Sequence, residues 1–119
     1  MTNDELSGDR EILVAAYREF NARCLDAVLA LMHPDVTWPN GMEGGYVHGH
    51  DGVRAYWTRQ WGILDPRVEP IKIEKDVKGR TVVEVHQVVR DLDGKLLLDT
   101  IVHHAYAIRE GLIVRMEIE

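Results

Sequence analysis

The sequence predicts an α+β fold in which helices pack on one face of an antiparallel sheet. Apolar residues recur at helical spacing in the first half of the chain, whereas apolar positions alternate along the second half. An Asp93–Gly94 pair between two long β-branched runs is typical of a hairpin turn. Because helices come first and strands follow, the order favours α+β over a parallel α/β arrangement.

Three helices are expected in the first half. The first should run from about Asp9 to Ala22, because its apolar positions share one helical face. A second, shorter apolar stripe runs from Leu25 to Met32 and stops at Pro34, which cannot continue a helix. After a short β-rich run at 36–38 and a glycine-containing loop, Asp51 is expected to cap a third helix. The residues expected inside that helix are Val53, Tyr56, Trp57, Gln60 and Trp61.

The second half is expected to form a meander of strands. Pro66 and Pro70 suit an edge strand, so the strand from Val68 to Lys75 is placed at the edge of the sheet. The next strands span 81–91, 95–108 and 112–119. Both alternating faces of the long strands are apolar, which predicts a homodimer that covers the outer face. The residues assigned to that outer face are Val83, Val85, Val89, Leu97, Ile101, Ala105 and Ala107.

Composition limits the classes of function. The chain has 119 residues and a mass of 13.6 kDa, which suits one domain spanning 1–119. Its net charge of −6 and the absence of a basic cluster argue against nucleic acid as a partner. A single cysteine, Cys24, excludes an internal disulfide and a zinc site built from several cysteines. Without a signal peptide or a segment of membrane-spanning length, we expect a cytoplasmic location and no membrane partner.

Four segments in a fixed order resemble one family. They are Phe20–Arg23 followed by Leu25–Ala27, Met32–Trp38, Gly49–Trp57 and Gly111–Met116. Together they are similar to the SnoaL-like branch of the nuclear transport factor 2-like superfamily, which includes ketosteroid isomerase and scytalone dehydratase. The resemblance implies a cone-shaped, cystatin-like α+β barrel: three helices on a strongly curved sheet around a deep apolar pocket. It implies no cofactor, and it does not fix the reaction, because fold alone does not determine function.

The resemblance also marks positions where relatives carry catalytic groups. Asn40 falls where steroid isomerases have a carboxylate base, and Asn21 falls where dehydratases have an aspartate. An amide cannot take a proton at neutral pH, so neither position offers the family's base. His104 falls at the oxyanion-donor position of the isomerases.

Two further histidines resemble those of scytalone dehydratase. His86 and Gln87 are similar to its histidine–glutamine pair on a pocket strand, and His48 is similar to its histidine before the third helix. Since an imidazole titrates near neutral pH, these residues are candidates for acid–base chemistry. The predicted catalytic residues are His48, His86 and His104.

The strand register decides where His86 points. A two-residue Asp93–Gly94 turn pairs His86 with Ile101 on the outer face and leaves Gln87 toward the pocket. One β-bulge reverses this and turns His86 inward. The family resemblance favours the inward position. The residues expected to bind substrate beside the histidines are Tyr17, Trp38, Asn40, Tyr56, Val102 and Met116.

Several functions remain open at this point. The first is an isomerase, cyclase, dehydratase or hydrolase that acts on an apolar ring-bearing or polyketide-like molecule through histidine acid–base chemistry. The alternatives are a non-catalytic small-ligand-binding protein and a dimeric interaction domain of the same fold. A metal held by His48, His86 and His104 is the less favoured alternative to a metal-free site.

Overall fold

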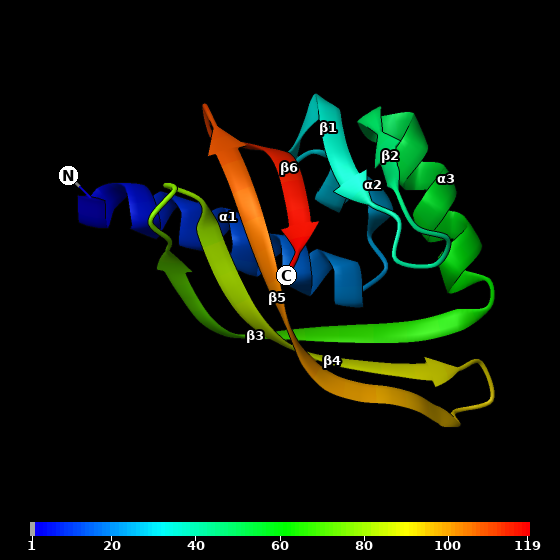
Figure 1. Ribbon diagram of the computed structural model, residues 1–119. Helices are drawn as coiled ribbons and strands as arrows, with labels where there is room; N and C mark the ends of the chain where they lie inside the picture. Colours follow the sequence, from blue (N-terminus) through cyan, green and yellow to red (C-terminus); the bar gives the residue numbers. More distant parts are fainter. Residues whose placement is uncertain (1) are drawn as a thin grey trace.

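A computed structural model describes residues 2–119, and it confirms the predicted α+β fold. The helices are α1 (Thr2–Asn21), α2 (Leu25–Leu29) and α3 (Gly49–Trp61). Figure 1 shows them gathered on one side of a strongly bent sheet whose strand order is β2-β1-β6-β5-β4-β3. The strands are β1 (Met32–Pro39), β2 (Tyr46–His48), β3 (Leu64–Lys75), β4 (Thr81–Asp91), β5 (Leu96–Arg109) and β6 (Leu112–Ile118).

The sheet differs from the expectation in one pairing. Strand β1 runs parallel to β6, with Met32 beside Ile113 and Thr37 beside Arg115, so the sheet is mixed. The meander from β3 to β6 is antiparallel throughout, as expected. Strand β3 lies at the edge of the sheet, in agreement with its two prolines.

Two local expectations in the first half are wrong. The chain enters β1 at Met32, so the second helix ends at Leu29, five residues before Pro34. The N-cap of α3 is His48, in extended conformation, and its side chain makes no capping hydrogen bond. Asp51 lies inside the first turn instead, where a carboxylate is favoured by the helix dipole.

The register of β4 and β5 places His86 opposite Ile101, so the expected inward position of His86 is wrong. Two one-residue shifts cancel here. The turn pairs Arg90 with Leu96, which would carry His86 inward. A bulge before Val89, which pairs with Leu98, shifts the register back.

The same register reassigns the faces of β4. Val83, Val85 and Val89 point inward and are buried, so the expectation that they form the outer face is wrong. Ile101 remains on the outer face and is half exposed. The inner face packs against α1 and α3 through Leu13, Tyr17 and Trp57 to form the core.

The end of α1 is tied to the edge strand by side chains. The Asn21 amide donates to the Val68 carbonyl at 2.8 Å and accepts from the Val68 N–H at 3.0 Å. Arg23 has a left-handed φ of 63° and donates to the Pro66 carbonyl and to Asp65. These contacts fix the spacing between the helical layer and β3. Across residues 2–119, the helices are all too short or too polar to cross a membrane.

Candidate functional site

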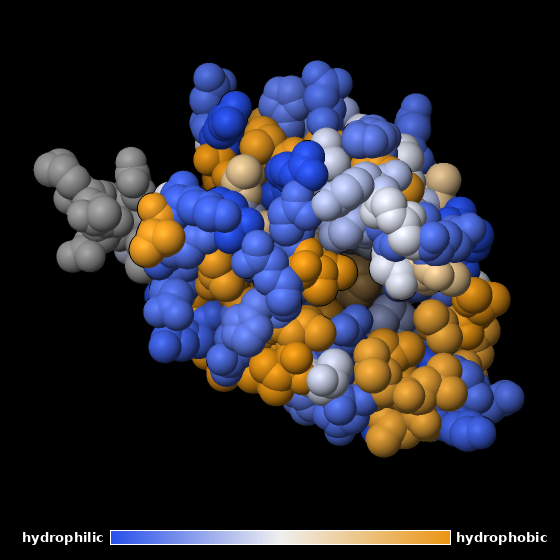
Figure 2. All heavy atoms as spheres, in the orientation of Figure 1, coloured by the Kyte–Doolittle hydropathy of each residue, from blue (hydrophilic) through white to orange (hydrophobic). Residues whose placement is uncertain are grey.

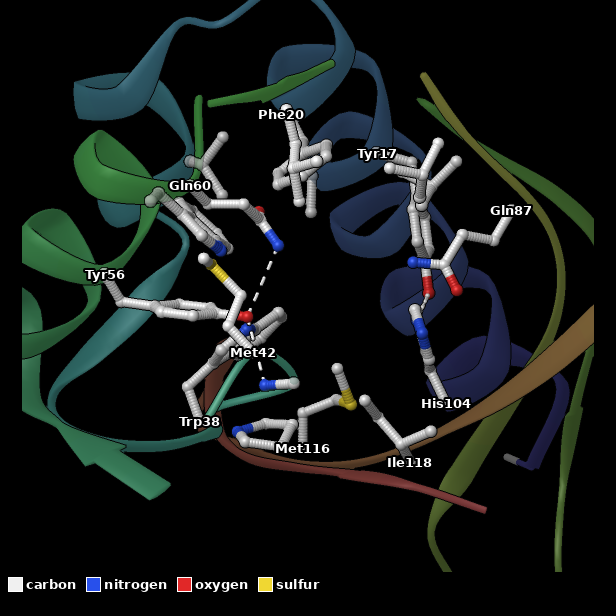
Figure 3. A pocket seen from close by; sticks show the side chains of 18 of the residues that line it. Tyr17, Phe20, Trp38, Met42, Tyr56, Gln60, Gln87, His104, Met116 and Ile118 are labelled. Carbon is white, nitrogen blue, oxygen red and sulfur yellow. Dashed lines mark hydrogen bonds between the residues drawn. The ribbon is translucent and has the colours of Figure 1, made fainter. Parts of the chain in front are cut away.

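A cavity of about 340 Å³ lies between the helices and the inner face of the sheet. Helix α1 contributes Tyr17 and Phe20, and α3 contributes Tyr56 and Gln60. Most of its wall is apolar or aromatic, which is typical of a small-molecule site. Figure 3 shows side chains from all these elements converging on the space. The lining comprises Ala16, Tyr17, Phe20, Val28, Trp38, Pro39, Gly41, Met42, Tyr56, Trp57, Gln60, Leu64, Val68, Gln87, Val89, Leu97, Leu98, His104, Tyr106, Met116 and Ile118.

One wall of the cavity carries a chain of three hydrogen-bonded groups. The Tyr106 hydroxyl donates to the Tyr17 oxygen at 2.8 Å, and the Tyr17 hydroxyl lies 2.9 Å from Nδ1 of His104. The Tyr17 and His104 rings are nearly parallel, with centroids 6.0 Å apart, and the Tyr106 ring is perpendicular to Tyr17. All three side chains are buried, so each ring is held in place by packing as well as by hydrogen bonds.

Burial sets the protonation state of this chain. Burial, together with a smaller contribution from the charge of the neighbouring His103, lowers the pKa of the His104 imidazole to about 4. Burial also raises the pKa of the Tyr17 and Tyr106 hydroxyls well above their ordinary value. At neutral pH the wall is therefore uncharged: a neutral imidazole backed by two neutral phenols.

The hydrogen bonds accommodate two tautomers of His104. With Tyr17 donating to Nδ1, the ring proton is on Nε2; with Nδ1 donating to the Tyr17 oxygen, Nε2 is an acceptor. Within residues 2–119, Nε2 has no hydrogen-bond partner, and the residue keeps 8% exposure at the cavity wall. In the first tautomer His104 has an unpaired N–H donor at the cavity wall.

A second polar pair lies on the opposite wall, on α3. The Tyr56 oxygen accepts from the Gly41 backbone N–H at 3.0 Å and from Nε2 of Gln60 at 3.3 Å. Burial raises the pKa of the Tyr56 hydroxyl, so it too is neutral and protonated. Figure 3 shows this pair across the cavity from Tyr17 and His104.

Five of the residues expected from the sequence line this cavity. Among the histidines only His104 does so. The neighbours placed with it are Tyr17, Trp38, Tyr56 and Met116.

The other two histidines lie elsewhere. His86 is on the outer face, where its Nε2 lies 2.6 Å from an Asp99 oxygen, and both side chains are about half exposed. His48 lies at the N-terminus of α3, with Nδ1 3.3 Å from Thr37 Oγ1. In the part of the chain described by the structure, no three histidine, cysteine or acidic side chains are grouped closely enough to hold a metal.

Asn40 and Val102 were also expected in the cavity and do not line it. Asn40 holds its own loop, because its Oδ1 accepts from the N–H groups of Met42 and Glu43. Val102 is on the inner face of β5, opposite Val85, and it packs against the core instead. Asn40, like Asn21, therefore carries an amide that binds backbone groups.

Several cavity residues were not selected from the sequence. Gln87 lines the cavity because of the register that turns His86 away. Gln60 lies one turn after Tyr56, and this helical spacing was the available signal for it. Phe20 and Met42 had no signal that separated a cavity position from ordinary core packing.

A family model described as the SnoaL-like domain matches residues 13–116. The chain belongs to the SnoaL-like domain family. This family is part of the nuclear transport factor 2-like superfamily. The assignment agrees with the strongly bent sheet and with the resemblance found in the sequence. No protein with curated function matches this SnoaL-like domain in sequence.

Solved structures similar to this SnoaL-like domain include TerC, co-crystallised with polyporic acid. TerC is 29% identical with a TM-score of 0.81, over 94% of this chain and 90% of TerC. A nuclear transport factor 2-like protein of unknown function from Burkholderia pseudomallei is 28% identical with a TM-score of 0.81, over 94% of this chain and 89% of that one. A putative polyketide cyclase from Pseudomonas putida is 22% identical, over 92% and 88% of the two chains, with a TM-score of 0.79. At that identity the cyclase supports the fold alone.

Proposed function

We propose that this SnoaL-like domain binds an apolar, ring-bearing molecule in the cavity and acts on it as a cofactor-independent enzyme of the isomerase, cyclase, dehydratase or hydrolase type. The observation that carries the proposal is the buried chain Tyr106–Tyr17–His104 in the wall of an aromatic-lined cavity, where Nε2 of His104 has no hydrogen-bond partner among residues 2–119. A buried hydrogen-bonded chain whose last group has no partner lowers the stability of the fold. Such groups are typical of functional sites, where a ligand supplies the missing partner.

The chemistry proposed for His104 is stabilisation of a developing negative charge on substrate oxygen. A neutral imidazole donates through Nε2 when Tyr17 donates to Nδ1, and Tyr17 and Tyr106 hold the ring in place. Donors fixed in advance inside a dry site stabilise an oxyanion far more strongly than water does. Gln87, on the same wall, offers an amide to the same end of the substrate.

The ring-bearing nature of the substrate is supported by the rest of the lining. The rings of Trp38 and Trp57 meet edge to face, with their centroids 5.3 Å apart. The Phe20 ring packs against Trp57 in the same way, with a centroid separation of 5.1 Å. Flat apolar molecules pack well against a wall made of such rings. The similarity to TerC, which was crystallised with polyporic acid, is in keeping with this class of ligand.

A specific observation favours non-catalytic binding as the second candidate. Within residues 2–119, no carboxylate lines the cavity, and Asn21 and Asn40 are engaged with backbone groups. A proton-abstracting enzyme needs a base, and a neutral imidazole whose pKa is about 4 is a weak one.

Turnover of a library of ring-bearing ketones and phenols separates the two candidates. For an enzyme, we expect conversion by the wild-type protein and a loss of roughly 100-fold or more in kcat/KM for His104→Gln, as for other oxyanion donors. His86→Gln is the matched control, because His86 lies on the outer face, and it should keep wild-type activity. If library members bind and none is converted, the result contradicts the catalytic proposal and supports non-catalytic ligand binding.

A homodimer through the outer face of β4 and β5 is a separate proposal. Ile101 is half exposed there, between the histidine–carboxylate contacts His86–Asp99 and His103–Glu84. A patch in which histidines and carboxylates flank an apolar residue can pair with its own copy across a two-fold axis. Light scattering should give twice the 13.6 kDa chain mass for the wild type and the single mass for Ile101→Glu. A monomeric wild type at micromolar concentration would exclude this dimer.

A further inference from the structure

The wall opposite His104 holds hydrogen-bonding capacity that the proposed chemistry does not use. Tyr56 is 4% exposed, and its ring stands against the cavity from α3. Its oxygen accepts two hydrogen bonds, one from Gly41 and one from Gln60, which fill both lone pairs. The hydroxyl proton of Tyr56 therefore has no acceptor among residues 2–119.

This conclusion holds for either orientation of the Gln60 amide. With Nε2 toward Tyr56, the Tyr56 hydroxyl proton has no acceptor among residues 2–119. With the amide turned over, Tyr56 donates to the amide oxygen, and the NH₂ group of Gln60 is free instead. In both cases the pair leaves one donor without a partner, and both side chains line the cavity.

The two polar walls face each other across apolar ones. Figure 3 shows Tyr56 and Gln60 on one side of the space and His104 and Gln87 on the other, with Phe20 and Met116 between them. A ligand with oxygen at one end only would leave the donor of the other wall without a partner, at a cost in binding free energy. A ligand with oxygen at both ends would satisfy both walls.

We propose that the Tyr56–Gln60 pair is a second binding subsite, and that the cavity selects elongated ring-bearing molecules with a hydrogen-bond-accepting oxygen at each end. One end binds the N–H of His104, and the other binds the donor of the Tyr56–Gln60 pair. This inference rests on the proposed function, because it specifies the substrate class of the same cavity. It makes Tyr56 and Gln60 specificity-determining residues.

Calorimetric titration with two pairs of probes of different length tests the inference. Each pair contrasts oxygen at both ends with oxygen at one end: para,para′-biphenol with para-phenylphenol, and hydroquinone with phenol. One additional hydrogen bond should tighten binding by about three- to tenfold. Symmetry alone gives a factor of about two, so a preference of at least about threefold in one pair supports the inference, and a smaller preference in both pairs overturns it.

Variants locate the preference. Tyr56→Phe should reduce it to the symmetry factor, whereas Tyr46→Phe, an exposed tyrosine bonded to Glu117, should leave it unchanged. If Tyr56→Phe does not fold, Tyr56→Phe/Gln60→Met is the second variant, because replacing both members of a hydrogen bond is less costly than orphaning one. A preference that survives in the folded variant overturns the assignment to Tyr56–Gln60. Failure of all four probes to bind contradicts the ring-binding function itself, which distinguishes the two failures.

Discussion

His104 and His86 lie on the same hairpin, yet they occupy opposite environments. His104 is on the inner face of β5, is buried, and is bonded to a neutral phenol. His86 is on the outer face of β4, is about half exposed, and is bonded to a carboxylate. The difference follows from strand alternation together with the register of β4 and β5, which pairs His104 with Val83 on the inner face and His86 with Ile101 on the outer face. The inner face keeps the imidazole of His104 neutral, and the outer face places that of His86 beside an exposed carboxylate.

Acid should destabilise the protein through His104. Above pH 6.5 the imidazole is neutral in both folded and unfolded states, since its ordinary pKa is 6.5. Between 6.5 and about 4 only the unfolded chain binds the proton, so the free energy of unfolding falls as the pH falls. The loss is complete below pH 4 and amounts to about 3 kcal/mol at most.

Urea unfolding at pH 7, 5 and 4 measures this loss. The His104→Gln protein should lack the part of the pH dependence that comes from the imidazole. The carboxylates of the chain still contribute to the pH dependence of both proteins. His86→Gln should retain the part of the wild-type dependence that comes from His104. Equal pH profiles for the wild type and His104→Gln would mean that the imidazole is not buried in the neutral form.

Removing the Tyr17 hydroxyl, the middle group of the Tyr106–Tyr17–His104 chain, should have the next largest effect on the free energy of unfolding. Tyr17→Phe leaves the Tyr106 hydroxyl and Nδ1 of His104 without partners in a buried place, at a cost of about 1–3 kcal/mol. Tyr46→Phe removes an exposed hydroxyl and should cost less than about 1 kcal/mol. Chemical denaturation at pH 7 gives both values. A Tyr17→Phe protein as stable as Tyr46→Phe would show that the inner chain does not stabilise the fold.

Breaking the contact between His86 and Asp99 on the outer face should have the smallest effect on the free energy of unfolding. Asp99→Asn removes the charge that faces His86, and both side chains are open to solvent, so the loss should stay below about 1 kcal/mol. The same denaturation measurement is made at low protein concentration. A loss above about 2 kcal/mol would mean that the outer face is covered, as in the proposed dimer, and repetition at higher concentration would confirm that cause.

The sequence was sufficient for most elements because their signals are local. The strand 81–91 was predicted with its exact bounds, since a β-branched run between Gly79 and the hairpin turn has few alternatives. The prolines of β3 likewise identified the edge of the sheet. The inward position of His104 required only the alternation of a single strand, which is why that prediction could be made.

The position of His86 required the sum of all register shifts between two strands. The turn shifts the register by one residue at Arg90, which pairs with Leu96. The bulge before Val89, which pairs with Leu98, shifts it back by one residue. Neither shift has a clear signal in the sequence. Asn40 and Asn21 posed a different difficulty. Their family positions are visible in the sequence, but their backbone partners, such as Val68, lie far along the chain or depend on loop geometry.

The contact between Asn21 and Val68 has a consequence for self-association. In an antiparallel strand the polar backbone groups of alternate residues point to the same side, so Pro66, Val68 and Pro70 all direct theirs to the unpaired side of β3. Two of these residues have no N–H, the carbonyl of Pro66 is taken by Arg23, and both groups of Val68 are taken by Asn21. Along residues 66–70, an incoming strand would find only the Pro70 carbonyl without a partner among the described residues, so this part of the edge resists fibril-like polymerisation. The Asn21 amide thus serves as a substitute for a neighbouring peptide group.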